Sequence, residues 1–186
     1  MTAPREIAED VLTTPVAGVN LVPGSLRRQL APTTTLFVFL RHFGCMFCRE
    51  TIADLRACTA ANAIYPKVLL FAQAGPVEAR TLLRDLWSEA HCVCDPDRRL
   101  YAAFGVERGT WRETLGPAVW RARSRASAKG HTNGERSGDV WMMPGAFLVQ
   151  SEHIVWSHTY RHAADHPDFA LIPELADTSA EDARRP

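Results

Sequence analysis

The fold is decided by the stretch Leu36-Phe37-Val38-Phe39-Leu40-Arg41-His42-Phe43-Gly44-Cys45-Met46-Phe47-Cys48. Its first part, Leu36 to Leu40, is a continuous apolar run of strand length, which is typical of a strand buried on both faces. From Arg49 onward, apolar residues recur at helical spacing until about Ala63. The sequence therefore predicts a buried strand that leads into a helix, with the two cysteines at the junction.

Two further strand-and-helix units follow this junction. Lys67 to Ala72 reads as a second buried strand, and Gly75-Pro76 as the start of a helix. His91 to Cys94 reads as a short third strand, and Asp95-Pro96-Asp97 as a turn that caps a helix ending near Gly105. This alternation predicts parallel strands connected by helices.

The last part of the chain favours antiparallel pairing. Ala146 to Val149 and Ile154 to Tyr160 read as a β-hairpin, followed by a short helix near Pro167 to Leu175. An apolar alternation around Val16 to Val22 indicates a small leading strand or hairpin. We therefore expect an α/β fold, with a central mixed β-sheet flanked by helices.

A length of 186 residues fits one domain, spanning residues 1–186. We expect its core at about 34–176, preceded by an N-terminal extension. The hydrophobic rhythm fails over 107–138, which we interpret as an insertion before the last hairpin, partly helical near its start and mobile near its end. We expect a flexible tail over 177–186.

Composition argues against several partners. Basic and acidic residues balance at 21 each, so no net charge favours nucleic acid. No apolar run approaches the roughly 20 residues needed to span a bilayer, so no membrane association is expected. Met1 to Leu12 lacks the features of a signal peptide, which favours a cytoplasmic protein. In a reducing compartment, five cysteines favour redox chemistry or metal binding over structural disulfides.

Cys45 and Cys48 have the spacing of a redox pair. Two cysteines three residues apart in the first turn of a helix lie on one face, close enough to form a disulfide. The helix N-terminus stabilises a thiolate and can lower the pKa of a cysteine from about 8.5 to roughly 3.5–7.5. We therefore predict a catalytic dithiol at this position.

Charged neighbours bear on that thiolate. Arg41, His42 and Arg49 could stabilise its negative charge, whereas Glu50 would oppose it if its carboxylate pointed at the sulfurs. We therefore expect Arg41, Arg49 and Glu50 to influence the site.

A metal site is an alternative that the cysteines leave open. Cys45, Cys48, Cys92 and Cys94 supply four thiolates, and Cys92 and Cys94 could share one face of a strand. Their spacing within a strand is unlike the turns of structural zinc sites. We therefore expect no metal and no cofactor, with a metal-bound structural domain as an alternative. Cys58 lies on the apolar helix face and is interpreted as inert core.

Three segments carry a family resemblance. They are Phe39 to Glu50, Asp95 to Gly105, and Gly138-Asp139-Val140 leading into Pro144-Gly145-Ala146-Phe147. Together they resemble the peroxiredoxin-like branch of the AhpC/TSA superfamily, including the SelL-related proteins, over roughly Thr34 to Asp168. The resemblance implies a thioredoxin-like fold and thiol-dependent redox activity, as an antioxidant enzyme or a disulfide reductase. It further implies a thiol reductant of the thioredoxin or glutathione type.

Two positions depart from that family pattern. Typical peroxiredoxins have the pattern Thr-x-x-Cys where this chain has Cys45-x-x-Cys48. They also carry an Arg where this chain has Pro144. Because the missing Thr and Arg would orient a peroxide, we expect efficient peroxidase activity to suffer. Pro144 instead occupies the place of the proline, often cis, that precedes the strand beside the redox centre in thioredoxin-like folds.

The order of attack stays open between two schemes. In a thioredoxin-like scheme, Cys45 attacks a protein disulfide and Cys48 resolves the mixed disulfide. In a peroxiredoxin-like scheme, a peroxide oxidises Cys48 to the sulfenate, which then condenses with Cys45. A third alternative is a redox-responsive interaction protein that forms the disulfide without turnover.

Other polar and aromatic residues are given structural interpretations. Arg121, Arg123, Arg125 and Lys129 are interpreted as a solvated, flexible basic loop. His158, His162 and His166 are interpreted as surface histidines, and Asp165-His166-Pro167-Asp168 as a turn without a catalytic role. Trp111, Trp120 and Trp141 could cover the active site, form a homodimer surface or pack in the core.

Overall fold

The computed structural model describes residues 4–134 and 138–182, and within them eight strands form one sheet in the order β1-β8-β7-β4-β5-β6-β2-β3. The strands are β1 (Arg5–Glu6), β2 (Pro15–Val19), β3 (Gly24–Ser25), β4 (Thr34–Phe39), β5 (Lys67–Ala72), β6 (His91–Cys94), β7 (Gly145–Gln150) and β8 (His153–His158). Strands β4, β5 and β6 are parallel, whereas β7 runs antiparallel to β4 and pairs with β8 in a hairpin. The predicted mixed sheet is confirmed.

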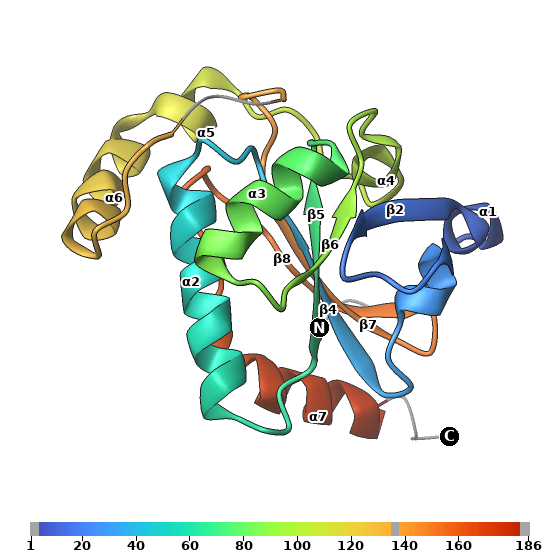
Figure 1. Cartoon of the computed structure of the whole chain (residues 1–186). Coiled ribbons are helices and arrows are strands. Elements are labelled where there is room, and N and C mark those ends of the chain that lie inside the picture. The colour runs from blue at the N-terminus through green and yellow to red at the C-terminus, as the bar shows by residue number, and fades with distance from the viewer. Residues whose placement is uncertain (1–3, 135–137, 183–186) are drawn as a thin grey trace.

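Helices cover both faces of this sheet (Figure 1). They are α1 (Glu9–Thr13), α2 (Met46–Ala61), α3 (Pro76–Leu86), α4 (Arg99–Ala103), α5 (Trp111–Leu115), α6 (Pro117–Ala128) and α7 (Ile172–Asp182), with the 3-10 helices η1 (Leu26–Gln29) and η2 (Phe169–Leu171). The core cluster on one face draws on α2, α3 and α7, and the cluster on the other face draws on α1, η1 and α4. Among these helices, none combines the length and apolar character that a membrane span requires.

Strand β4 is the centre of both clusters. All six of its residues are buried, as the unbroken apolar run predicts. Leu36 and Val38 point into one cluster, and Phe37 and Phe39 point into the other. Phe39 stacks on Phe71 of β5 at a centroid distance of 4.2 Å. Since burying such a side chain contributes about 1.5–3 kcal/mol, this strand fixes the sheet from which the site is built.

The chain leaves β4 through a short loop and enters α2 at the cysteine pair. The backbone N–H of Leu40 donates to the carbonyl oxygen of Phe71 at 2.9 Å, which keeps the loop on the neighbouring strand. The Tyr101 hydroxyl lies 2.6 Å from the Leu40 oxygen and 2.9 Å from the Phe71 oxygen. Tyr101 therefore joins α4 to the ends of β4 and β5.

The sheet extends further toward the N-terminus than the core expected at 34–176. Strand β2 pairs with β6 and with β3, so the hairpin indicated around Val16 to Val22 is present and spans Pro15 to Ser25. Strand β1 pairs with β8, and neither β1 nor α1 was expected. A two-residue strand and a five-residue helix are too short for hydrophobic periodicity to reveal. Gly18 permits β2 to approach β6, because a Cβ atom there would lie 1.8 Å from the Cys92 carbonyl oxygen.

The insertion and the tail are more regular than the sequence predicts. Helix α6 includes residues 121–128, which were expected to form a flexible loop. The final helix runs Ile172–Asp182 instead of 167–175, because Asp168 caps η2 first, and it takes up much of the expected tail. Residues 135–137 and 183–186, which belong to the predicted mobile segment and tail, lie outside the described residues.

Replacing Tyr101 by Phe tests the link between α4 and the strand ends. The Leu40 carbonyl loses its hydroxyl donor in a buried place, so we expect Tyr101→Phe to lower the free energy of unfolding by about 1–3 kcal/mol. Urea denaturation measures the change. Tyr65→Phe is the matched control, because that half-buried hydroxyl donates a single bond to Phe169. An equal or larger loss in the control would contradict the assignment.

Candidate active site

Cys45 and Cys48 lie where the sequence places them, at the junction of β4 and α2. Cys45 is the N-cap residue of α2, and Cys48 lies in its first turn. Both side chains are buried, with 4% of each residue exposed, and both are free thiols. The backbone N–H groups of Cys48 and Arg49 donate to the Cys45 carbonyl oxygen at 3.1 and 3.2 Å. The helix thus begins at the first cysteine, and the backbone N–H groups of Cys48 and Phe47 also act on its sulfur.

Arg41 contacts both sulfurs. Its Nη1 donates to the Sγ of Cys45 at 3.3 Å, and its backbone N–H donates to the Sγ of Cys48 at 3.3 Å. Its Nε and Nη2 donate to the carbonyl oxygens of Met142 and Val140 at 2.9 and 2.7 Å. Arg41 is itself buried, so its charge acts on Cys45 with little screening by water. Arg41, one of the expected supporting cations, therefore reaches the Cys45 sulfur with its guanidinium.

A second layer of residues holds Arg41 and its acceptors in place. The side-chain amide of Gln73 donates to the Arg41 carbonyl oxygen, and its Oε1 accepts from the backbone N–H of Asp139 at 2.9 Å. The Asp139 carboxylate forms ion pairs with Arg98 at 2.8 Å and Arg108 at 3.1 Å. The segment that carries Val140 and Met142 is therefore tied to β5 and α4.

The two thiols differ in acidity. The pKa of Cys45 is lowered to about 6. The hydrogen bond from the Cys48 thiol lowers it most, and the charge of Arg41 and the backbone N–H groups of Cys48 and Phe47 lower it further, whereas burial opposes the shift. The pKa of Cys48 is raised well above its usual value, because its thiol donates to Cys45 and because it is buried. At neutral pH the pair therefore holds a thiolate on Cys45 and a proton on Cys48.

A pocket of about 360 Å³ opens beside Cys45. It is lined by Arg41, His42, Gly44, Cys45, Met46, Phe47, Thr114, Leu115, Val119, Trp120, Arg123, Asn133, Gly134, Val140 and Trp141. Residues from 114 to 134 belong to the predicted insertion, so the insertion forms one wall. It is held there by Gly134, whose N–H donates to the Gly44 carbonyl oxygen at 3.0 Å, and by Asn133, whose Oδ1 accepts from the Met46 N–H at 3.2 Å. The volume is that of a small-molecule pocket.

The tryptophans divide between this pocket and the surface. Trp120 and Trp141 line the pocket, and Trp120 is 67% exposed. Trp111 is also mostly exposed. The interpretation of these residues as active-site cover therefore fits two of the three.

Glu50 does not face the sulfurs. Its carboxylate is fully buried and accepts from Arg125 at 2.9 Å and from Lys129 at 3.1 Å, both from the end of the insertion. Burial alone would raise the pKa of Glu50, but the bonds and charges of Arg125 and Lys129 outweigh it and lower the pKa. The carboxylate is thus paired with these cations, and the condition under which it would oppose the thiolate is not met. Arg125 and Lys129 are exposed as expected, but they stand at the end of α6 and not in a flexible loop.

The Arg49 side chain reaches the insertion at Gly134. A Cβ atom on Gly134 would lie 2.9 Å from its Nη2, so its guanidinium packs against the loop that covers the start of α2. The Nε atom of Arg49 is buried without a partner among the described residues. A contribution of Arg49 to the thiolate is thus not supported by a contact.

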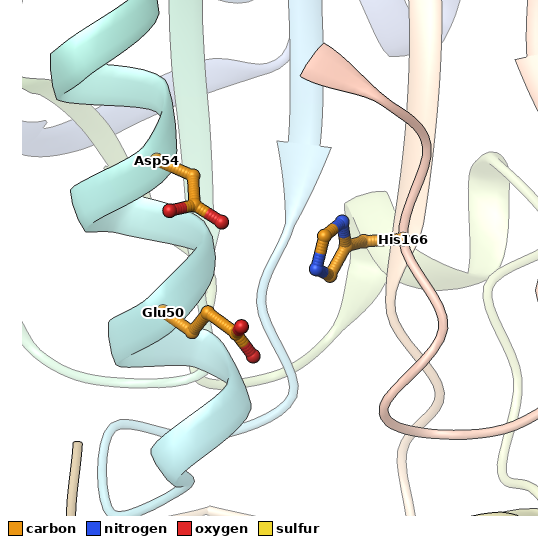
Figure 2. Close-up of side chains that lie close together, drawn as sticks. All are labelled: Glu50, Asp54 and His166. Atoms are coloured by element: carbon orange, nitrogen blue, oxygen red, sulfur yellow. The ribbon is translucent and has the colours of Figure 1, made fainter. Parts of the chain in front are cut away.

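Glu50 and Asp54 project from α2 toward His166 on the segment that follows β8 (Figure 2). One ligand atom from each lies within 4.8 Å of the others, and in the described residues this is the one His/Cys/Asp/Glu group that meets such a spacing. Lys129 lies 2.8 Å from Asp54, and Arg125 pairs with Glu50, so ion pairs already balance the carboxylates. The geometry is that of a joint between α2 and α6.

The four cysteines do not converge on a metal. Cys92 lies in the core cluster and Cys94 packs against it, so they share a face of β6 as expected. Their sulfurs do not gather with those of Cys45 and Cys48 at ligand spacing in the described chain. The four-thiolate site is therefore not formed. Cys58 is half-buried and packs against the core, as interpreted from its helix face.

Pro144 lies on the side of the cysteine pair where Cys48 is found. It lines a narrow crevice with Cys48 and directly precedes β7. Every peptide bond in residues 4–134 and 138–182 is trans, so Pro144 does not adopt the cis form often found at the corresponding place in thioredoxin-like folds.

A family model described as AhpC/TSA antioxidant enzyme matches residues 68–162, about half of the chain. The chain belongs to the AhpC/TSA family. The matched part runs from β5 to just beyond β8 and begins after the cysteine pair. For this AhpC/TSA chain, family membership and the sheet that frames the pair are thus shown, whereas the roles of the two sulfurs rest on their geometry.

Solved structures support the same fold. Peroxiredoxin Q of Xanthomonas campestris aligns with a TM-score of 0.61 at 14% identity, covering 94% of this chain and 97% of that one. A secreted Mycobacterium tuberculosis disulfide oxidoreductase homologous to E. coli DsbE aligns with a TM-score of 0.54 at 14% identity, covering 91% and 99%. Peroxidoxin BcpB of Mycobacterium tuberculosis aligns with a TM-score of 0.57 at 12% identity, covering 97% and 99%. No curated protein matches the sequence.

Several residues of the AhpC/TSA chain that build the site were given no site role from the sequence, although Tyr101 and Asp139 lie in the segments that carry the family resemblance. Gln73 and Asp139 hold Arg41, Tyr101 supports the strand ends, and Asn133 holds the insertion. Gln73 offered a signal, because it is a polar residue directly after a buried strand. Asn133 offered none, since it lies in a stretch without periodicity.

Removing the guanidinium of Arg41 is expected to raise the pKa of Cys45 from about 6 toward the ordinary cysteine value near 8.5. Arg41→Met removes the charge. Arg41→Lys keeps the charge but lacks the guanidinium, whose nitrogens reach both carbonyl oxygens and the Cys45 sulfur. The pH dependence of Cys45 alkylation, located by mass spectrometry, measures the shift. Arg49→Met is the control and should leave the midpoint in place; a shift there equal to that of Arg41→Met would contradict the assignment.

Replacing Glu50 by Gln tests the joint between α2 and α6. Because the folded-state pKa of Glu50 is lowered, its contribution to stability is present above about pH 4.3 and is lost as the pH falls through the folded value. We expect Glu50→Gln to lower the free energy of unfolding by about 1–3 kcal/mol at pH 7, with the difference closing in acid. Denaturation at several pH values measures it. Asp54→Asn, which removes a partly exposed carboxylate, should cost less; a pH-independent effect of Glu50→Gln would argue against the charge pairing.

Proposed function

We propose that the protein is a thiol-disulfide oxidoreductase in which Cys45 attacks the substrate and Cys48 resolves the covalent intermediate. One observation carries this order: Cys45 holds the thiolate and lines the 360 Å³ pocket, whereas Cys48 holds the proton and lines the crevice on the inner side. A thiolate is the nucleophile in disulfide exchange. The order corresponds to the thioredoxin-like scheme.

The proposed reaction has two exchange steps. The Cys45 thiolate attacks one sulfur of a substrate disulfide, forms a mixed disulfide and releases the other sulfur as a thiolate. Cys48 then loses its proton and attacks the Cys45 sulfur, so the second substrate sulfur leaves as a thiolate. The substrate gains two electrons and the protein is left with a Cys45–Cys48 disulfide, which an external dithiol or two glutathione-type thiols would reduce.

Arg41 stabilises the thiolate that attacks in each of the two steps. Its guanidinium lies against the attacking sulfur and favours its negative charge. Its backbone N–H faces the Cys48 sulfur and favours the thiolate that must form there for the second step. The carbonyl oxygens of Met142 and Val140 fix the guanidinium, so no reorganisation is needed on attack.

Peroxide reduction is a second candidate for the same pair. The family name and the buried guanidinium beside Cys45 favour it, because Arg41 supplies a cation although Pro144 replaces the expected arginine. In this reaction the Cys45 thiolate breaks the O–O bond, becomes a sulfenic acid and releases an alcohol or water after protonation. Cys48 then condenses with the sulfenic acid, and the second oxygen leaves as water.

The order of attack is tested with Cys45→Ser and Cys48→Ser. We expect Cys45→Ser to abolish reduction of both a disulfide and a peroxide substrate by at least about 10³-fold, because the nucleophile is lost. We expect Cys48→Ser to form a stable mixed disulfide on Cys45 without turnover. Coupled assays with a thioredoxin-type reductant, together with intact-mass measurements, give both readouts.

The same experiment separates the alternatives. An adduct trapped on Cys48 in Cys45→Ser, with Cys48→Ser inert, would contradict the proposed order and support the peroxiredoxin-like scheme. A disulfide that forms in the native chain without turnover of either substrate would support a redox-responsive interaction protein instead.

A further inference from the structure

The wall that the insertion contributes to the pocket beside Cys45 is mainly apolar. Helix α6 packs beside α2 (Figure 1), and its buried Val119 lines the pocket together with the exposed Leu115 and Trp120. Trp141 lines the same space from the loop before β7. A cavity of about 150 Å³ can hold benzene, so a pocket of about 360 Å³ has room for a substituted aromatic ring. The two tryptophans favour such a ring, because aromatic pairs attract beyond their area of contact.

The charged side chains of this pocket are positive. Arg41, His42 and Arg123 are the lining residues that can carry a charge, and in the described part of the chain no aspartate or glutamate lines the pocket. The Arg41 guanidinium donates to two carbonyl oxygens and to the Cys45 sulfur, so it serves the thiolate. His42 is engaged in a contact of its own. Arg123 is therefore the cation that can meet a ligand.

The exposed guanidinium of Arg123 lies beside Trp120, one turn earlier on α6. Its Cζ is 5.9 Å from the centre of the Trp120 ring, within the range of a cation–π contact. No carboxylate of residues 4–134 and 138–182 pairs with Arg123, whereas Arg125, two residues further on, pairs with the buried Glu50. The N–H donors of Arg123 thus remain for the two oxygens of a carboxylate, which a guanidinium binds in a fixed planar geometry.

Within the proposed function, we propose that the substrate is the disulfide of a small aromatic carboxylic acid. Its ring packs against Trp120 and the apolar wall, its carboxylate binds Arg123, and its near sulfur lies against the Cys45 thiolate. Arg123 also offsets the repulsion between an anionic substrate and the anionic sulfur. Cys45 bonds to the near sulfur as the S–S bond breaks with its electron pair on the far thiolate. Attack by Cys48 then releases the near half as a second thiolate.

Three small disulfides test the carboxylate and the ring separately. Dithiobis-nitrobenzoate has a carboxylate on each aromatic ring, dithiodipyridine has the rings without a carboxylate, and dithiodipropionate has the carboxylates without a ring. Each is added to the reduced chain carrying Cys58→Ser and Cys94→Ser, which removes the two half-buried thiols. Intact masses after acid quenching give the rate at which the free dithiol is lost. Because the three disulfides differ in inherent reactivity, the quantity compared between chains is the ratio of two rates.

The carboxylate is tested with Arg123→Met. We expect the rate with dithiobis-nitrobenzoate, divided by the rate with dithiodipyridine, to fall about tenfold, since a hydrogen-bonded charge pair is lost. Arg123→Lys should restore part of this ratio, because it keeps the charge without the planar fork. Arg121→Met is the matched control, because Arg121 is also exposed on α6 but does not line the pocket, and it should leave the ratio at the native value.

The ring is tested with Trp120→Leu. We expect the rate with dithiobis-nitrobenzoate, divided by the rate with dithiodipropionate, to fall about fivefold, because the contact between aromatic rings is lost. Trp111→Leu is the matched control, since Trp111 is a similarly exposed tryptophan that does not line the pocket, and it should keep the native ratio.

Other outcomes would overturn the proposal. An unchanged carboxylate ratio in Arg123→Met would exclude the carboxylate site. An equal fall in Arg121→Met would do the same, because it would indicate the general positive charge of α6 in place of a specific contact. An unchanged ratio in Trp120→Leu would exclude an aromatic substrate. A native chain whose dithiol survives all three disulfides would contradict the proposed function itself, which separates that failure from a wrong substrate class.

Discussion

The contact between the Arg41 guanidinium and the Cys45 sulfur is the interaction on which the rest of the site depends. A buried guanidinium is costly unless its donors are satisfied, and here two go to the carbonyl oxygens of Met142 and Val140 and a third to the sulfur. The polar residues behind it, Gln73 and Asp139, fix the same carbonyl segment. The charge that favours the thiolate is therefore supplied by an arrangement that also joins the loop before α2 to the loop before β7.

The two cysteines are made unequal by their surroundings. Cys45, at the helix N-cap, gains the helix N–H groups, the Arg41 charge and access to the pocket, whereas Cys48 faces inward and keeps its proton. A Cys-x-x-Cys motif alone does not reveal this difference between the two cysteines. Its meaning here comes from the elements that close around it, which include an insertion with little hydrophobic rhythm of its own.

Secondary structure could be predicted from the sequence where a strand is almost completely buried. The apolar run of β4, the strand bounds of β5 and β6, and the placement of the cysteine pair could all be predicted, because period and composition are local properties. The order of α6 could not, since its arginine and lysine look like a solvated face until Glu50 of a distant helix is known to be buried opposite them. For the same reason Glu50 and Arg49 were expected near the sulfurs, although their side chains reach the insertion. Gln73 and Asp139 act through contacts across about 66 residues of chain, which no local pattern reveals.

The ion pairs between α2 and the end of α6 also have a mechanical consequence. Helix α2 carries the attacking sulfur at its first residue, and its next turns hold α6 through Glu50 and Asp54 (Figure 2). The wall of the pocket is thus mounted on the same helix as the nucleophile. A displacement of α2 would carry both together, so the distance from the sulfur to the opposite wall would be preserved while the sheet behind them moves. The part of the wall that α6 supplies is then mounted on the helix of the nucleophile, whereas the lining residues Arg41, Val140 and Trp141 belong to the loops that follow β4 and precede β7.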